Sequence, residues 1–157
     1  MKKYKILTII ICLMITLSLT ACNSPSKKKE RSPEELLDLY VEAMEKGKYE
    51  NVEKVVPKFY LDANNFSRES FDQGLKAARD EFGDDIKVTY EIKEKRKMDD
   101  SEIKKANEYL SQFDNYKEVT ECYELDGTIT YSGSKFTDPD PLGMSYCKIE
   151  GQWYLIF

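Results

Sequence analysis

Apolar residues recur at helical spacing through the first half of the chain. Residues 32–35 read Ser-Pro-Glu-Glu, which is typical of a helix start with serine at the N-cap and proline in the first turn. Apolar positions three and four residues apart follow, up to Gly47. A second helix is predicted over residues 49–56, with residues 59–61 packing beneath it. A third helix is predicted over residues 66–83.

The pattern then changes to a period of two. Apolar and polar residues alternate over residues 86–92, which predicts a half-buried strand that continues into the charged residues 93–97. Residues 99–101 offer an N-cap for a fourth helix, whose apolar face extends over residues 103–113.

From Val119 onward the pattern predicts β-structure. Asp-Gly at residues 126–127 is either a bulge within one long strand or a two-residue turn between two strands. Residues 133–143 are predicted to form an exposed connection, and residues 142–149 and 152–157 the last two strands. Helices followed by an antiparallel meander predict an α+β fold, with the N-terminal helices covering one face of a curved antiparallel sheet.

The beginning of the chain has the features of an export signal. An uncharged, mostly apolar run over residues 6–19 is shorter than the roughly 20 residues of a membrane-spanning helix. Residues 19–22 read Leu-Thr-Ala-Cys, which resembles the lipobox of bacterial lipoproteins. The run is preceded by the lysines of a positive n-region, Lys2, Lys3 and Lys5.

The lipobox resemblance implies cleavage before Cys22 and attachment of a diacylglyceryl group to its sulfur, the modification of palmitate-bearing lipoproteins. The alternatives are a plain secretory signal and an uncleaved anchor. We therefore expect a signal peptide over residues 1–21, a lipidated tether over 22–31 and one α+β domain over 32–157. The expected location is the extracytoplasmic face of the cell membrane, where two acyl chains hold a protein far longer than one.

The domain itself resembles the NTF2-like (cystatin-like) superfamily. The resemblance rests on the helix start at 32–35, the order of helices and strands, and the closing segment 147–155, in which a Gly turn leads into Trp-Tyr-Leu. It implies a cone-shaped cavity between sheet and helices. The superfamily includes both enzymes and binding proteins, so membership alone assigns no activity.

Charge and composition exclude several classes of protein and kinds of site. Of the 157 residues, 34% are charged, but the net charge is only −5, and removing the signal makes it −8. A basic nucleic-acid-binding protein is therefore not expected. The chain has no histidine, which excludes a Ser-His-Asp triad and His-ligated zinc. No cofactor and no metal site are expected.

Two of the four cysteines remain in the domain once the signal is removed and Cys22 is lipidated. Cys122 and Cys147 both lie in predicted strands of an exported domain, where disulfides persist. They form either a disulfide or two buried free thiols, because the strand register decides whether they come within reach.

The candidate site is a pocket lined by aromatic side chains. Asp62 and Glu91, flanked by tyrosines, are the nearest candidates for acid–base chemistry, but their spacing is that of solvated carboxylates, so no catalytic residue is predicted. Aromatic residues can instead line a ligand pocket, or they can simply form a tyrosine-rich core. The residues proposed to line the pocket are Tyr40, Tyr60, Tyr90, Tyr123, Tyr131 and Trp153.

The expected function is a non-enzymatic binding or interaction module of the cell envelope. Its expected partners are membrane lipid, through the anchor on Cys22, and an envelope protein or small ligand. The alternative is a small-molecule carrier or sensor that uses the aromatic-lined cavity.

Overall fold

The computed structural model describes residues 30–157, and residues Arg31–Phe157 form one compact unit. The predicted signal peptide, Cys22 and the tether up to residue 29 lie outside the described residues. Among residues 30–157, none of the helices combines the length and the apolar composition that a bilayer span requires.

The helices begin and end largely where the sequence predicts them. Ser32 and Glu35 form a capping box, in which the Glu35 amide donates to Ser32 Oγ and the Ser32 amide donates to Glu35 Oε2. Gly47 ends the first helix with a φ of 69°, a left-handed conformation that favours glycine. The helices of the described residues are α2 (Pro33–Lys46), α3 (Tyr49–Val55), α4 (Lys58–Ala63), α5 (Arg68–Phe82) and α6 (Asp100–Leu110).

One helix was missed by the sequence prediction. Residues 59–61 were expected only to pack beneath the second helix, but they lie within a separate short helix, α4. Pro57 ends α3 and also starts α4, because its carbonyl accepts hydrogen bonds from the Tyr60 and Leu61 amides.

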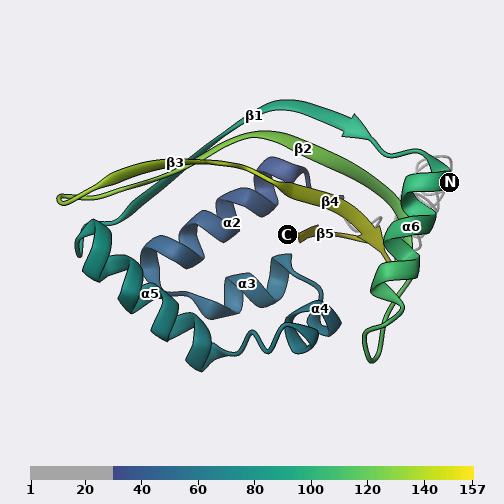
Figure 1. Ribbon diagram of the computed structural model, residues 1–157, viewed down its shortest axis with the longest axis horizontal. Helices are drawn as coiled ribbons and strands as arrows, with labels where there is room; N and C mark the ends of the chain where they lie inside the picture. The colour runs from purple at the N-terminus through teal and green to yellow at the C-terminus, as the bar shows by residue number, and fades with distance from the viewer. Residues whose placement is uncertain (1–29) are drawn as a thin grey trace, which may run out of the picture. The chain divides into compact units, whose positions relative to one another are not determined.

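A five-stranded antiparallel sheet follows the helices, as expected (Figure 1). Its strands are β1 (Lys87–Lys97), β2 (Val119–Ser132), β3 (Thr137–Pro141), β4 (Met144–Ile149) and β5 (Gln152–Ile156). The order is β1-β2-β4-β5, and β3 pairs with β2 beyond the end of β4. The edge strand β1 ends in residues 93–97, all of them charged.

The strand β2 runs without interruption through Asp126 and Gly127, so the hairpin alternative is wrong. The register shifts across from them, between residues 92 and 94 of β1, which leaves Lys93 as the extra residue. A Cβ at Gly127 would lie 1.9 Å from the Glu91 carbonyl oxygen, so this close approach of the two strands requires glycine.

The predicted connection over residues 133–143 is also partly wrong, because it contains β3. Pro139 and Pro141 pair with Thr130 and Thr128 of β2. Prolines are tolerated at sheet edges because their missing amide donor is not needed on the solvent side. The segment was predicted as a loop because its two prolines and two aspartates are typical of turns.

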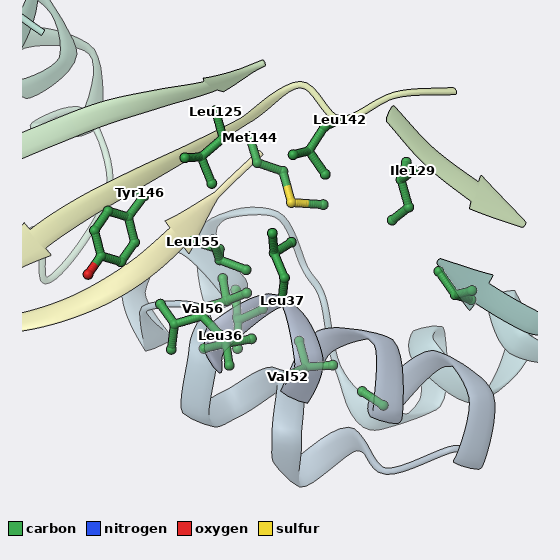
Figure 2. Close-up of a cluster of buried hydrophobic side chains, with 14 of the residues drawn as sticks. Leu36, Leu37, Val52, Val56, Leu125, Ile129, Leu142, Met144, Tyr146 and Leu155 are labelled. Carbon is green, nitrogen blue, oxygen red and sulfur yellow. The ribbon is translucent and has the colours of Figure 1, made fainter. Parts of the chain in front are cut away.

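The main core lies between the sheet and the helices α2 and α3. Figure 2 shows Leu36, Leu37 and Val52 from the helices, with Val56 directly after α3, facing Leu125, Met144 and Leu155 from the strands. Leu36, Leu37 and Leu155 are completely buried. This apolar contact fixes the helices on one face of the sheet.

A smaller apolar cluster covers part of the opposite face. Cys122 and Cys147 alternate with Tyr123 and Tyr146, so their side chains point away from the main core. They pack with Leu110 of α6 and with Phe59, Val119 and Ile149. The helices therefore cover both faces of the sheet near β2 and β4, whereas the sequence predicted one covered face.

Candidate functional site

A cavity of about 370 Å³ lies among α2, α3, α4, α5 and Phe157. Among the described residues 30–157, none of the side chains that line it is charged, in a chain that is 34% charged. The lining residues are Tyr40, Met44, Val52, Val56, Tyr60, Leu61, Asn64, Phe66, Ser70, Phe71, Gly74, Leu75 and Phe157. The expected cavity lay between sheet and helices, but these walls come mainly from the helices.

Tyr49 fixes the segment that joins α4 to α5 at one side of the cavity. Its hydroxyl donates a hydrogen bond of 2.9 Å to the Phe66 carbonyl. Its ring centroid lies 6.3 Å from that of Phe66 and 5.6 Å from that of Phe71. Ser67 then caps α5 by accepting from the Ser70 amide. The two phenylalanines are thereby held at the cavity wall.

Phe157 closes another part of the wall. The Tyr60 hydroxyl donates to a main-chain oxygen of Phe157. The Phe157 ring packs against Tyr40, with 5.3 Å between the centroids. Two of the predicted aromatic residues, Tyr40 and Tyr60, therefore line the cavity together with Phe157.

Tyrosines are the only titratable side chains among the lining residues. Burial raises the pKa of Tyr40 above its usual value, and the neighbouring Tyr131 raises it further. Burial also raises the pKa of Tyr60. Both hydroxyls therefore stay protonated at neutral pH, so the walls bind by apolar contact and neutral hydrogen bonds.

Tyr131 and Tyr90 do not line this cavity. Tyr131, on β2, shares a hydrogen bond with the Tyr40 hydroxyl. Tyr90, on β1, donates to Asp38 Oδ1 at 2.8 Å and contacts the Glu34 carbonyl at 3.2 Å. Both tyrosines tie the sheet to α2.

Tyr123 and Trp153 lie in a separate aromatic cluster on the sheet, together with Tyr146. The Tyr123 ring centroid lies 5.8 Å from that of Trp153 and 6.1 Å from that of Tyr146, and Tyr146 stacks on Trp153 with 4.1 Å between centroids. Lys95 lies 4.6 Å from the Tyr123 ring centroid. Of the six candidate lining residues, Tyr40 and Tyr60 therefore line the cavity, and strand register and helix packing place the other four elsewhere.

The two carboxylates considered for catalysis lie away from the cavity lining. Asp62 forms an exposed ion pair with Lys58 at 2.9 Å, and Glu91 is exposed on β1. Within residues 30–157, no group of three or more His, Cys, Asp or Glu side chains is placed to hold a metal ion.

Sequence reasoning missed most of the cavity wall. Phe66, Phe71 and Leu75 were assigned only to a helix and its apolar face, and Gly74 was not singled out. A glycine in the middle of an amphipathic helix was the one available signal, because glycine costs a helix about 1 kcal/mol relative to alanine.

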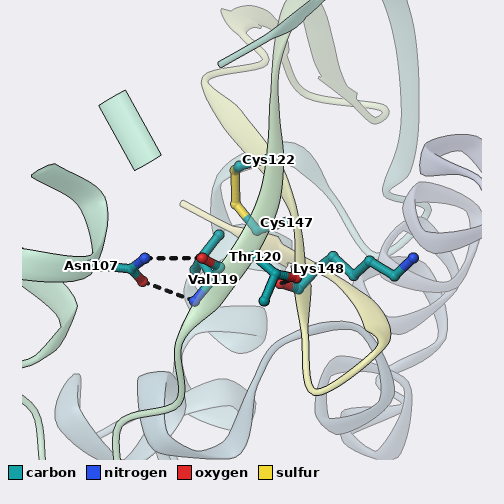
Figure 3. Close-up of a disulfide and its surroundings, with 6 residues drawn as sticks. All are labelled: Asn107, Val119, Thr120, Cys122, Cys147 and Lys148. Atoms are coloured by element: carbon teal, nitrogen blue, oxygen red, sulfur yellow. Dashed lines mark hydrogen bonds between the residues drawn. A yellow bond between two sulfur atoms is a disulfide. The ribbon is translucent and has the colours of Figure 1, made fainter. Parts of the chain in front are cut away.

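The structure joins Cys122 and Cys147 in a disulfide, with 4.1 Å between their Cα atoms (Figure 3). They are direct partners in the β2–β4 register. The Cys122 carbonyl accepts from the Met98 amide on the other side of β2, so the cysteines form a pair without backbone hydrogen bonds, in which side chains come closest.

Near this disulfide, the side chain of Asn107 binds the edge of β2 in the way that a neighbouring strand would (Figure 3). Its Nδ2 donates to the Val119 carbonyl at 2.9 Å, and its Oδ1 accepts from the Val119 amide at 2.8 Å. Oδ1 also accepts from the Tyr116 hydroxyl at 2.6 Å. The side-chain amide of Asn107 thus makes the two hydrogen bonds to the Val119 backbone that a neighbouring strand would otherwise make.

Asn107→Ala is expected to lower the free energy of unfolding by about 2 kcal/mol, because the amide and carbonyl of the buried Val119 lose their partners. Urea unfolding measures the change. Asn107→Asp keeps the acceptor and loses one donor, so it should be destabilised as well. Wild-type stability in Asn107→Ala would contradict the assigned role.

Arg96 connects β1, β2 and α6 through two glutamates. It binds Glu102 through two hydrogen bonds of 2.9 Å, and it binds Glu124 Oε2 through two more, of 3.0 Å and 2.6 Å. Arg96, and the Asp99 amide next, lower the pKa of Glu102 from 4.5 to about 2. The ionised carboxylate is therefore favoured in the folded state.

Because the folded-state pKa of Glu102 is lowered, its contribution to stability is present above pH 4.5 and is lost as the pH falls toward 2. The difference in unfolding free energy between wild type and Glu102→Gln should therefore shrink over this pH interval. Urea titrations at several pH values between 2 and 6 measure it. A difference independent of pH would refute the assignment.

Searches against protein-family models, curated proteins and solved structures find no match to this chain.

Proposed function

We propose that this chain is a non-enzymatic, lipid-anchored binding protein of the extracytoplasmic face of the cell membrane. Its binding site is the uncharged cavity among α2 to α5, and its ligand is a small apolar component of the envelope. The observation that carries the binding role is a cavity of ligand size whose described lining side chains are all uncharged. The signal features up to Cys22 support the anchor.

The lining residues favour binding over catalysis. Proton transfer at neutral pH needs a group whose pKa lies near 7. The titratable side chains of the wall are tyrosines, and burial moves the pKa values of Tyr40 and Tyr60 further from neutrality. The two candidate carboxylates, Asp62 and Glu91, lie outside the lining.

We also propose that the domain belongs to the NTF2-like superfamily. The order of helices before a curved antiparallel sheet supports this placement, as does the closing hairpin of β4 and β5 with its turn at Glu150–Gly151. The function proposed above depends on the cavity and not on this relationship.

A small apolar photoreactive probe tests the binding role. Membranes that contain the native protein are illuminated with adamantane diazirine, and the labelled residues are identified by mass spectrometry. Labels are expected on Phe71 and Leu75 inside the cavity, in excess of the exposed Tyr109. Labelling of Tyr109 without labelling of the cavity residues would reject the proposed site.

A further inference from the structure

We infer that the cavity takes up one acyl chain of a lipid from the bilayer that carries the protein. This inference rests on the proposed function and names the ligand class. Three features of the molecule support it: the exposed rim of the cavity, the paired charges beside that rim and the free space next to Gly74.

The rim of the cavity exposes aromatic side chains. In the described residues, the exposed large hydrophobic side chains are Phe66 (38%), Phe157 (47%), Phe136 (50%) and Tyr109 (58%). Phe66 and Phe157 line the cavity. Exposed aromatic rings are unfavourable in water but are stabilised in the interfacial region of a bilayer. We call the part of the cavity at Phe66 and Phe157 its mouth. The exposed rings there suit contact with a membrane surface.

The charges beside the mouth neutralise one another. Arg68 pairs with Glu50 at 3.5 Å, and Lys58 pairs with Asp62 at 2.9 Å. Residues 63–67, of which Asn64 and Phe66 line the cavity, have no charged side chain. These side chains therefore add no net charge beside the cavity, which suits a zwitterionic or uncharged headgroup left outside it.

The size of the cavity suits a single chain. A volume of about 370 Å³ is near the lower end of the range of roughly 300–1,000 Å³ seen for small-molecule sites. A Cβ built at Gly74 meets no atom within 4 Å, so the missing side chain leaves open space at the wall. Each methylene buried there contributes about 0.8 kcal/mol, so a chain gains more than a compact polar ligand.

The predicted tether allows the mouth to reach the bilayer. Residues 22–31 are ten residues, which extend to at most about 35 Å. This length exceeds what is needed to bring one side of a domain of this size to the surface.

Site-directed filling of the cavity tests the inference. The full-length lipidated protein is reconstituted in phosphatidylcholine vesicles that contain phosphatidylcholine with a diazirine in one acyl chain. After illumination, labels are expected on Phe71 and Leu75. Gly74→Leu should reduce them roughly tenfold, because a helical leucine leans toward Ser70 and Phe71 and fills the space of chain methylenes.

Gln73→Leu is the matched control, because it adds the same side chain at an exposed position of α5 outside the cavity lining. It should leave the labelling unchanged. Equal labelling of Phe71 in both variants would overturn the inference. Gly74→Leu also replaces a helix-destabilising glycine at an exposed position, so the fold is expected to persist, and thermal unfolding verifies this.

A second pair of variants tests the rim. Phe66→Ala should lower the chain labelling of Leu75, whereas Phe136→Ala, an exposed phenylalanine away from the cavity, should not. If adamantane diazirine labels the cavity and the lipid chain does not, the acyl-chain inference is wrong and the proposed binding role stands. If a free diazirine fatty acid labels the cavity and the phosphatidylcholine chain does not, the inference that the chain comes from a bilayer lipid is overturned.

Discussion

Replacing Cys22 by alanine is expected to abolish lipidation and to leave the precursor unprocessed. The residue lies outside the described part of the structure, so this expectation rests on the lipobox resemblance of residues 19–22. Without the thiol there is no atom to carry the diacylglyceryl group. Labelling with radioactive palmitate, the mass of the N-terminal peptide and partitioning into a detergent phase measure the outcome.

Cys12→Ala is the matched control for that experiment. Cys12 lies in the apolar run that is removed with the signal, so its replacement should leave processing and lipidation normal. Normal processing and detergent partitioning of Cys22→Ala would show that the anchor is not attached there. The proposed location on the membrane would then be wrong, whereas the cavity and its chemistry would be unaffected.

Removing the disulfide is expected to lower the free energy of unfolding by about 3 kcal/mol. The bond closes a loop with a sequence separation of 25, and a cross-link of that length restricts the unfolded chain by about this amount. The double variant Cys122→Ala/Cys147→Ala avoids leaving a lone thiol in the small apolar cluster. Chemical denaturation of the oxidised wild type and of the double variant gives the difference.

A reducing agent provides the control for the disulfide prediction. It should lower the stability of the wild type toward that of the double variant and leave the double variant unchanged. Equal stability of wild type and double variant under oxidising conditions would mean that the bond is absent from the native protein or contributes nothing to its stability.

Local patterns predicted most of the secondary structure correctly. The capping box of Ser32 and Glu35, the left-handed Gly47 and the alternation over residues 86–92 are decided by neighbouring residues, so they can be read from the chain. The helix α4 and the strand β3 were missed for the opposite reason. Each is short and depends on partners elsewhere, and each contains or follows a proline that is typical of turns.

The candidate site was predicted less well, because a cavity is formed by residues that are distant in the sequence. Tyr40 and Tyr60 line it as expected, but Trp153 stacks on Tyr146 in the sheet. Composition alone does not show which face of an element an aromatic residue occupies. Phe66 reaches the wall because Tyr49 holds its carbonyl, a contact between residues 17 positions apart.

The charged edge strand β1 affects whether neighbouring copies of the protein can pair with one another when they are crowded together. Anchoring in a bilayer, as proposed, confines the protein to two dimensions, where copies meet far more often than in free solution. An open strand edge would then pair with the same edge of a neighbour. Five consecutive charged residues at 93–97, together with the extra residue Lys93, make such pairing unfavourable. Pairing through the β1 edge is therefore disfavoured even if copies of the protein are dense on the proposed membrane surface.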